Sequence, residues 1–290
     1  MAVRDIQFDY TTVGHVTADV MPDGVRRPGG GAFYSALQAS RLGMRARIIT
    51  RGVPAEIRAL LAPHADELDV QILRAPATTT LATSGLGPAR RQRILAWAGE
   101  MPDDIDVGGG ILHLSPVARE CPRSWAGGPA FVGFTPQGLA RRWAGLGEEL
   151  EPATPERDAL TVAEACDAIV LSEPESRTCE ELLARGLSAG ALVAVTAEAG
   201  PNTLLLPDGT REVPVPALGA PAADDLGAGD VYAAALFVSL AGGDGAQDAA
   251  RFANAAAAVR MLGRGAGAIG DRAAVLARLR STGSSAADGA

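Results

Sequence analysis

The chain of 290 residues is long enough to form a large domain with a substantial core. Its formal charge is −8 and it has no basic run, which speaks against nucleic acid as the main partner. Hydrophobic residues make up 47% of the sequence, yet no stretch approaches the roughly 18 uninterrupted apolar residues of a membrane span. We therefore expect a protein that binds neither nucleic acid nor a membrane.

Two further features of the composition constrain the chemistry. The three cysteines show no CxxC spacing and the N-terminus shows no signal peptide, so we expect a reducing, cytoplasmic setting without a metal cluster. All 26 basic residues are arginine. A phosphate site in this chain must therefore use arginine, backbone N–H groups or a metal ion, and lysine-dependent P-loop chemistry is excluded.

Apolar strand-like runs alternate with helical patterns along the chain. The expected strands are 6–16, 45–50, 110–115, 131–134, 168–171 and 192–195, and the expected helices include 31–42, 55–61 and 176–187. This order predicts an α/β fold with three layers, α/β/α, around a mostly parallel central sheet. Ligands gather at the carboxyl ends of such strands, where we expect the glycine-rich segments 29–31 and 227–229.

The most informative motif is Asp-Asp-Leu-Gly-Ala-Gly-Asp at 224–230, directly before an apolar helical stretch. First-turn N–H groups of a helix lack internal partners and attract anions, and glycines allow the backbone to approach a phosphate closely. Asp230 lies in the same turn, where it can accept the proton of an attacking hydroxyl. A plain loop with Asp230 as a helix cap explains an isolated Gly-x-Gly-Asp equally well.

The whole segment resembles the Asp-Thr-x-Gly-Ala-Gly-Asp signature of the ribokinase-like (phosphofructokinase B type) carbohydrate kinases, with Asp225 in place of the threonine. The resemblance implies that Asp230 is the catalytic general base and that Gly227, Ala228 and Gly229 form an anion hole. It also implies a ribokinase-like fold and the cofactors ATP and Mg²⁺, and it leaves room for a monovalent cation.

Segments 20–28 and 70–98 interrupt the alternation, and both read as β-structure or turns away from the main sheet. By the same resemblance we expect them to form a small β lid. Only nine residues separate Asp19 from Gly29, which predicts a reduced lid. Residues 1–280 are expected to be a single kinase domain, and 281–290 a disordered tail.

The segment 29–43 resembles the first signature of the family, and implies that Gly29 and Gly30 lie against the phosphate acceptor. Tyr34 stands at the position of the family's asparagine, so it would contact the acceptor differently. Asp19 matches an aspartate that accepts hydrogen bonds from acceptor hydroxyls. The plainer interpretations are a glycine-rich loop before an amphipathic helix and an aspartate in a turn.

The segment Thr-Pro-Gln-Gly-Leu-Ala-Arg-Arg-Trp at 135–143 resembles a divergent branch of the family with the pattern Thr-Pro-Gln-Gly-x-x-Arg-x-Trp. The resemblance implies that Gln137 faces the substrate. Arg141 would neutralise the transferring phosphate, a task that a chain without lysine must assign to another group. Alternatively, both arginines of the segment lie on a solvated helix face.

The donor side carries weaker signals. Glu175 matches a glutamate that orients water on Mg²⁺, although an acidic residue that opens a helix explains it nearly as well. Thr196, Asp225 and Asn254 are the expected nucleotide contacts. The loop that begins at Thr196 matches poorly, because Glu198 and Pro201 stand where glycines are expected, and helix packing explains Asn254 equally well.

We therefore expect an ATP-dependent kinase that phosphorylates a hydroxyl of a sugar, nucleoside or cyclitol, as a monomer or homodimer. A catalytically idle ribokinase-like protein that binds a small molecule is the alternative, and the replaced loops at Ser172 and Glu198 motivate it. A third hypothesis is a different acceptor, such as a hydroxymethylpyrimidine.

Overall fold

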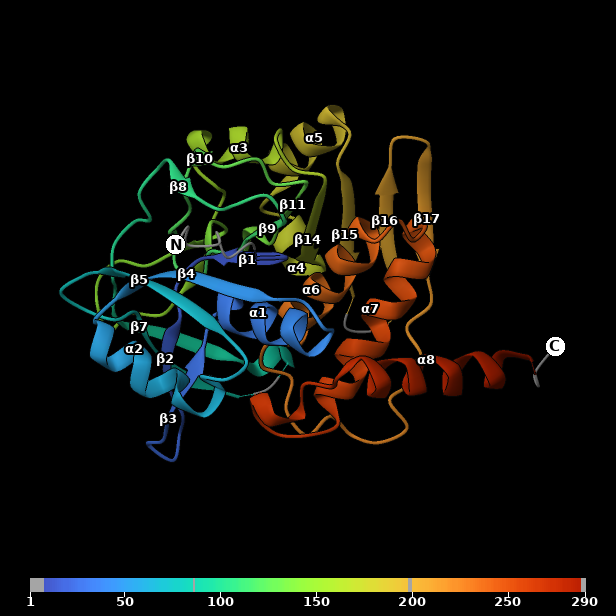
Figure 1. The fold of residues 1–290 in the computed structure, drawn as a ribbon, viewed down its shortest axis with the longest axis horizontal. Coiled ribbons are helices and arrows are strands. Elements are labelled where there is room, and N and C mark those ends of the chain that lie inside the picture. The colour runs from blue at the N-terminus through green and yellow to red at the C-terminus, as the bar shows by residue number, and fades with distance from the viewer. Residues whose placement is uncertain (1–7, 86, 198–199, 288–290) are drawn as a thin grey trace, which may run out of the picture.

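The computed structural model describes residues 8–85, 87–197 and 200–287, and these residues are organised around a large sheet and a smaller one (Figure 1). In spatial order, the strands of the large sheet are β17 (Gly209–Val213), β16 (Asn202–Leu206), β15 (Leu192–Thr196), β14 (Ala168–Ser172), β11 (Phe131–Phe134), β9 (Ile111–Leu114), β1 (Tyr10–Val13), β4 (Ala46–Gly52) and β5 (Asp69–Arg74). All neighbours from β15 to β5 are parallel, and β16 and β17 are added antiparallel.

Helices cover both faces of this sheet. One face carries α1 (Gly31–Arg41), α2 (Pro54–Leu61), α6 (Ala228–Ala241) and α7 (Ala246–Met261), with α8 (Arg272–Ala287) packed against α7. The opposite face carries α3 (Arg157–Ala163) and α5 (Glu180–Ala189), and the short α4 (Glu173–Ser176) follows β14. The expected three-layer α/β/α architecture with a mostly parallel sheet is confirmed.

Helix α6 is the central helix of its layer. Its residues from Val231 to Ser239 are all buried, because the helix is apolar on every side. Residues of α1 pack on one flank of α6 and the alanine-rich α7 on the other. The N-terminus of α6, where the motif at 224–230 ends, is thereby held against the sheet.

The smaller sheet has the order β3 (Arg26–Gly29), β2 (Thr17–Val20), β6 (Thr80–Ser84) and β7 (Arg91–Ala96). It contains most of the residues that we expected in a lid, and we call it the lid sheet. Within the segment 20–28, residue 20 belongs to β2 and residues 26–28 belong to β3, and residues 21–25 connect the two strands. Strand β5, which we expected in the lid, instead extends the main sheet parallel to β4. The physical reason is the connection through α2, which returns the chain to the same sheet as a parallel crossover.

Two other boundaries differ from the sequence-based expectation. The strand expected at 6–16 is only Tyr10–Val13, because the backbone turns at Gly14, where a Cβ atom would lie 2.2 Å from the carbonyl oxygen of Ser115. Residues 1–7 are outside the described part. Helix α8 extends to Ala287, past Ser281, where we expected order to end; no proline interrupts it.

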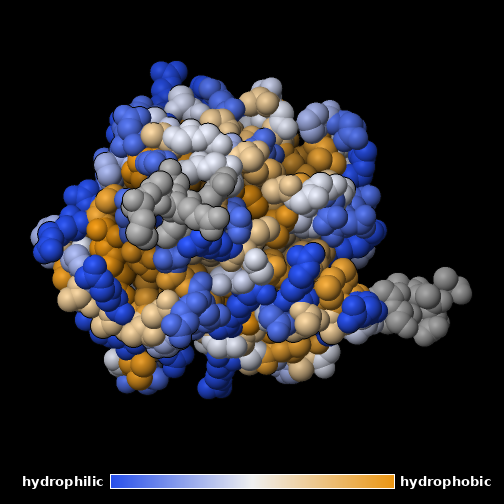
Figure 2. Space-filling model, in the orientation of Figure 1, coloured by the Kyte–Doolittle hydropathy of each residue, from blue (hydrophilic) through white to orange (hydrophobic). Residues whose placement is uncertain are grey.

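The remaining elements are short. They are β8 (Ile105–Asp106) paired with β10 (Trp125–Ala126), β12 (Arg141–Arg142) paired with β13 (Glu151–Pro152), and the 3₁₀ turns η1 (Ala62–His64), η2 (Gly87–Ala89), η3 (Pro136–Gly138) and η4 (Ala266–Ala268). No helix within the described ranges has the length and apolarity needed to cross a membrane. Figure 2 shows hydrophilic and hydrophobic residues interspersed over the face that carries α1, α7 and α8.

Candidate active site

The motif at 224–230 forms a tight turn into α6. Gly227 is the N-cap of the helix, with φ of 79°, a left-handed conformation that favours glycine. The N–H of Ala228 donates to the carbonyl oxygen of Asp225 over 3.1 Å. The helix itself offers no acceptor to the N–H groups of Gly229 and Asp230, so these remain for an anion. Of the three residues expected to form an anion hole, Ala228 cannot contribute its N–H, because that group is bonded to Asp225.

Asp224 anchors the start of this turn. Its Oδ1 accepts the N–H of Leu226 over 3.0 Å, and its Oδ2 accepts the N–H of Gly265 and a guanidinium N–H of Arg260, each over 2.9 Å. Burial by itself would raise the pKa of Asp224, but these three hydrogen bonds outweigh it and lower the pKa. Asp224 is thus an ionised structural residue beneath the turn.

The carboxylate of Asp230 lies between the N-termini of α6 and α1. A Cβ atom added to Gly31 would lie 2.7 Å from Asp230 Oδ1 and 2.1 Å from Ser115 Oγ, so glycine is required there for the carboxylate to fit. The backbone oxygen of Asp230 accepts a hydrogen bond from Ser35 Oγ over 3.2 Å, which fixes the first turn of α6 against α1. Gly31 and Ser35 are site residues that the sequence reasoning did not single out.

Burial is the main cause that raises the pKa of Asp230 to about 7. The neighbouring carboxylates of Glu175 and Asp19 raise it further, whereas the guanidinium groups of Arg141 and Arg90 oppose the rise. A carboxylate with a pKa near neutrality is suited to general-base work, because it can take up a proton and still be ionised in an appreciable fraction of molecules.

Asp19 lies on β2 of the lid and not, as we expected, directly after the first strand of the main sheet. It is almost fully buried, and Thr17 Oγ1 donates to its Oδ1 over 2.8 Å. Burial raises its pKa to about 6, against the hydrogen bond from Thr17 and the charges of Arg141 and Arg90. A Cβ atom on Gly29 would lie 2.3 Å from Asp19 Oδ2, so Gly29 lies directly against this carboxylate.

Gly30 and Tyr34 connect the acceptor side with the phosphate side. Gly30 is the N-cap of α1 with φ of 87°, and a Cβ atom there would lie 2.2 Å from the carbonyl oxygen of His15. Tyr34 is buried, and a Cβ atom on Gly227 would fall 2.4 Å from its ring carbon Cγ. The phenol ring therefore supports the anion-hole turn, a contact that the sequence did not reveal.

Two arginines approach the site from different elements. Arg141, on β12, is half-buried and donates Nη1 to the carbonyl oxygen of Val117 over 3.1 Å. Burial lowers its pKa, while the charges of Glu175 and Asp230 raise it and that of Arg90 lowers it further. The positive guanidinium groups of Arg141 and Arg90 therefore repel each other, and a bound phosphate would offset that repulsion.

Arg90 was missed by the sequence reasoning. It lies at the tip of the lid hairpin between β6 and β7 and forms an ion pair with Asp225, whose other oxygen accepts the N–H of Gly87 over 2.8 Å. Asp225, expected at the nucleotide, thus holds the lid against the phosphate loop. The sequence offered one signal for Arg90: it is a basic residue in the expected lid segment of a chain that has no lysine.

The other expected contacts are spread over the carboxyl ends of neighbouring strands. Gln137 is half-buried in η3, directly after β11. Thr196 ends β15, and its Oγ1 lies 3.4 Å from the carbonyl oxygen of Leu171. Asn254 is buried, accepts a hydrogen bond from Asn202 over 2.8 Å and donates to the carbonyl oxygen of Pro214 over 3.2 Å. Asn254 therefore has a packing role, and Glu198 lies outside the described residues.

Glu175 has a structural role at the N-terminus of α4. Its Oε2 accepts the N–H of Ser172 over 2.8 Å, while the Ser172 side chain accepts the N–H of Glu175, which makes a capping box. In the described part of the chain, no group of three or more histidine, cysteine or acidic side chains is arranged to hold a metal ion. These residues form no all-protein cage, so a Mg²⁺ here would need donor phosphates and water for most of its ligands, and Glu175 would be the acidic residue to orient such a water.

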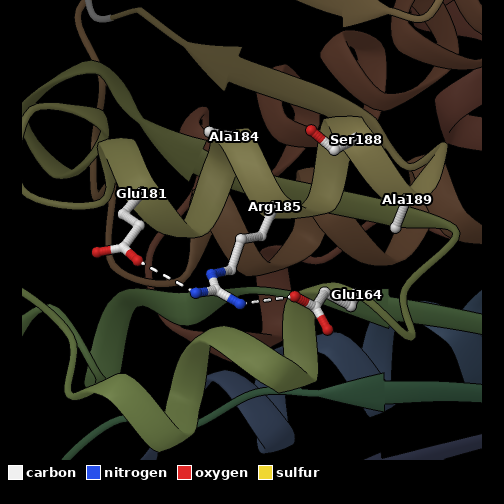
Figure 3. Close-up of a pocket in the computed structure, with 6 residues that line it drawn as sticks. All are labelled: Glu164, Glu181, Ala184, Arg185, Ser188 and Ala189. Carbon is white, nitrogen blue, oxygen red and sulfur yellow. Dashed lines mark hydrogen bonds and ion pairs between the residues drawn. The ribbon is translucent and has the colours of Figure 1, made fainter.

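A surface hollow lies on the opposite face, between α3 and α5 (Figure 3). Arg185 spans it and pairs with Glu164 over 2.8 Å and with Glu181 over 3.4 Å. The single positive charge of Arg185 leaves the hollow with a net negative charge, which does not suit a phosphate, and none of the residues discussed above lines it. The chemistry of the protein is therefore expected at the N-terminus of α6.

Comparisons with known proteins agree with this fold. A family model of the pfkB family carbohydrate kinases matches residues 150–271, the segment that contains the motif at α6. No curated protein matches the sequence.

Solved structures match over nearly the whole length. A pyrophosphate-dependent kinase in the ribokinase family, complexed with a pyrophosphate analog and myo-inositol, is 22% identical with a TM-score of 0.73, covering 92% of this chain and 99% of its own. The nucleoside kinase of Methanocaldococcus jannaschii is 16% identical with a TM-score of 0.70, covering 95% and 99%. A fructokinase double mutant from Vibrio cholerae O395, with fructose, ADP and a potassium ion, is 20% identical with a TM-score of 0.68, covering 94% and 99%. The chain therefore has the fold of these kinases of the ribokinase family, and its residues 150–271 match the model of the pfkB family carbohydrate kinases.

Proposed function

We propose that the protein is a kinase that transfers a phosphoryl group to a hydroxyl of a small polyol, with Asp230 as the general base. The observation that carries the proposal is the position of Asp230: a carboxylate with a pKa of about 7 at the N-terminus of α6, beside the free N–H groups of the turn. A purely structural cap would gain nothing from a pKa so far above its ordinary value.

In this mechanism the acceptor hydroxyl donates its hydrogen bond to Asp230. As the new bond between the acceptor oxygen and phosphorus forms, the proton passes to the carboxylate of Asp230. The bond between phosphorus and the donor's leaving oxygen breaks, and its electron pair stays with the leaving group. The N–H groups of Gly229 and Asp230 and the guanidinium of Arg141 stabilise the negative charge on the transferring phosphoryl group. Arg90 adds a further positive charge when the lid covers the site.

Bound Mg²⁺ would neutralise the charge of the donor phosphates. Glu175 would hold a water on that ion through Oε1, because its Oε2 already accepts the capping hydrogen bond from the N–H of Ser172. The acceptor would be held at the other end by Asp19, Gly29, Gly30, Tyr34 and Gln137. A buried carboxylate next to glycines suits a sugar, nucleoside or cyclitol, whose neighbouring hydroxyls donate hydrogen bonds.

We propose ATP as the donor, and inorganic pyrophosphate as a second candidate. The buried amide of Asn254 favours the second, since both its oxygen and its nitrogen are engaged within the protein and not available to an adenine ring. The kinase with pyrophosphate analog and myo-inositol shows that the fold accommodates both this donor and a cyclitol. An arginine-based phosphate site serves either donor, because it recognises phosphate and not the base.

The test is a screen of ATP and pyrophosphate against sugars, nucleosides and inositols, run in parallel for the natural protein and Asp230→Asn. Turnover of an acceptor that disappears in Asp230→Asn supports the kinase. Tight binding of an acceptor without turnover under any donor would instead favour the idle binding protein. Asp248→Asn is the matched control, because Asp248 is also an aspartate in the first turn of a helix but is exposed and paired with Arg251.

A further inference from the structure

Arg260 is a fully buried arginine directly behind the phosphate-binding turn. It lies on the last turn of α7, and its guanidinium group donates hydrogen bonds to oxygens of two loops. Nη2 donates to Asp224 Oδ2 over 2.9 Å and to the carbonyl oxygen of Leu226 over 2.6 Å. Nη1 donates to the carbonyl oxygens of Gly263 over 3.1 Å and of Asp224 over 3.3 Å. One cation thus joins the loop before α6 to the loop after α7.

The two loops are also tied to each other. Asp224 Oδ2 accepts the N–H of Gly265 over 2.9 Å, and the N–H of Ala223 donates to the carbonyl oxygen of Met261 over 2.8 Å. Three carbonyl oxygens and one carboxylate oxygen therefore converge on a single buried positive charge. Such a charge is tolerated in the interior only when it is paired and hydrogen-bonded in this way.

Arg260 also reaches the turn through Tyr34. The guanidinium carbon lies 5.7 Å from the centre of the Tyr34 ring, within the range of a cation–π contact. The same ring packs against Gly227, the left-handed residue that opens the anion hole. Arg260 therefore supports the turn twice, once through the oxygens of Asp224 and Leu226 and once through Tyr34.

Carbonyl and carboxylate oxygens gathered behind a phosphate loop are the ligands that an alkali metal cation requires. In this chain those oxygens already accept hydrogen bonds from Arg260. A monovalent cation, which the sequence left open as a cofactor, does not fit the site that these oxygens form.

We propose that Arg260 is a built-in cation for the phosphate-binding turn, a positioning residue that takes the place of a monovalent metal ion and makes the protein independent of one. A guanidinium group offers several donors in a fixed plane and stays charged, so it can hold two loops at once without an exchangeable ion. The effect of Arg260 on phosphoryl transfer rests on the proposed kinase function. Its effects on folding and on anion binding do not depend on that function.

The first experiment uses the natural protein in potassium chloride and in N-methyl-D-glucamine chloride at equal ionic strength. We measure the melting temperature, the affinity for pyrophosphate and for ADP, and, for any acceptor that is turned over, kcat. All of these should agree within about twofold, or within the error of the melting temperature, between the two salts. A several-fold gain in affinity or kcat, or a clear stabilisation by potassium alone, overturns the proposal.

The second experiment removes the guanidinium group with Arg260→Ala, which leaves the oxygens of the two loops without their cation. Pyrophosphate affinity should fall by about 10–100-fold, as for loss of a charged group that orients an anion site. Potassium chloride or low guanidinium chloride should then restore part of the affinity and raise the melting temperature, which N-methyl-D-glucamine should not do. Arg251→Ala is the matched control, because Arg251 is an exposed arginine on the same helix, and it should show neither the loss nor the rescue.

The outcomes separate the two proposals. If no acceptor is phosphorylated but the salts and variants behave as above, the kinase assignment fails and the role of Arg260 stands. If Arg260→Ala folds and binds pyrophosphate as tightly as the natural protein, Arg260 has no role in the turn. If Arg260→Ala does not fold, Arg260→Lys provides the test: one ammonium cannot reach both loops in the same way, so its affinity should fall, and unchanged affinity would contradict the proposal.

Discussion

The two ends of the candidate site are built in different ways. At the phosphate end, the turn from Asp224 to Asp230 is organised by backbone hydrogen bonds, one left-handed glycine and a buried arginine. At the acceptor end, Asp19 and Gly29 belong to the lid sheet, and side chains from β2, α1 and η3 surround the space. Backbone geometry tolerates few substitutions, whereas a wall of side chains can be altered residue by residue.

This contrast explains why the phosphate end resembles the family closely and the acceptor end departs from it. A helix N-terminus binds phosphate whatever the phosphate is attached to, so its requirements stay the same for every acceptor. Tyr34 illustrates the other case, because its ring supports Gly227 and its hydroxyl is influenced by the charge of Asp19. We therefore expect acceptor specificity to depend on the side chains at the lid end.

The largest effect should come from Asp230→Asn. The amide keeps the shape of the side chain but takes up no proton, so kcat should fall by about 10³-fold or more. In the natural protein kcat/KM should fall about tenfold for each pH unit below pH 7, because only the ionised carboxylate acts as base. A pH profile of kcat/KM for any acceptor that is turned over, and kcat of the variant, check these expectations.

The same variant should be more stable than the natural protein at pH 8. The pKa of Asp230 is raised in the folded state, so its contribution to stability is present below the ordinary pKa of 3.8 and is lost as the pH rises through about 7. Asp230 is half-buried, so solvent screens part of this effect, and removing its charge should gain at most about 4 kcal/mol at pH 8 and nothing below pH 4. Equal melting temperatures at pH 8 would mean that the carboxylate is fully solvated, and would contradict its assignment as a desolvated base.

The second largest effect concerns the left-handed glycine at the phosphate end. Gly227→Ala should lower the free energy of unfolding by about 2–4 kcal/mol. The left-handed backbone at this position is strained for alanine, and the new Cβ atom overlaps the Tyr34 ring. Gly229→Ala is the control, since no heavy atom lies within 4 Å of its added Cβ atom. Urea unfolding of both variants makes the comparison, and equal stabilities would show that the turn is not rigid.

A smaller effect is expected from the arginines after η3. Arg141→Ala should reduce kcat/KM by about 10–100-fold, because the charge of Arg141 interacts with that of Asp230 and would stabilise a transferring phosphoryl group. Arg142→Ala should change it by less than about twofold, because Arg142 is exposed and pairs with Glu151 on the neighbouring strand. Steady-state kinetics of the two variants test whether Arg141, and not Arg142, serves the site. A similar loss of kcat/KM in both variants would mean that any positive charge in this segment has the same effect.

The smallest effect should come from the contact between lid and loop. Asp225→Ala removes the partner of Arg90 and the acceptor of the Gly87 N–H, yet the pair is partly exposed, so stability should fall by less than about 1 kcal/mol. The lid should open more often, and limited proteolysis within 85–91 should become several-fold faster. An unchanged cleavage rate would show that Asp225 does not hold the lid, and would return it to the donor side of the site.

Much of the fold followed from the sequence. The alternation of strand and helix patterns predicted the parallel sheet and its two helical layers, because hydrophobic periodicity is a local property of the chain. The motif at 224–230 predicted a turn into a helix for the same reason, and strand Phe131–Phe134 was predicted with its bounds. The membership of β5 in the main sheet was not predicted, since a strand pattern does not state which sheet the strand joins.

Sequence alone determined that any phosphate site in this protein must use arginine, backbone N–H groups or a metal ion. It also determined that the carboxylate of Asp230 lies in the first turn of a helix. Only the tertiary structure decided which arginines take part: Arg90 reaches the loop from the lid, and Arg260 lies buried behind it. It also showed that Asn254 and Glu175 bond to neighbouring groups of the protein itself. The physical reason is that a residue type sets which contacts are available, whereas packing brings together groups far apart in the chain and thereby sets their charge, partners and exposure.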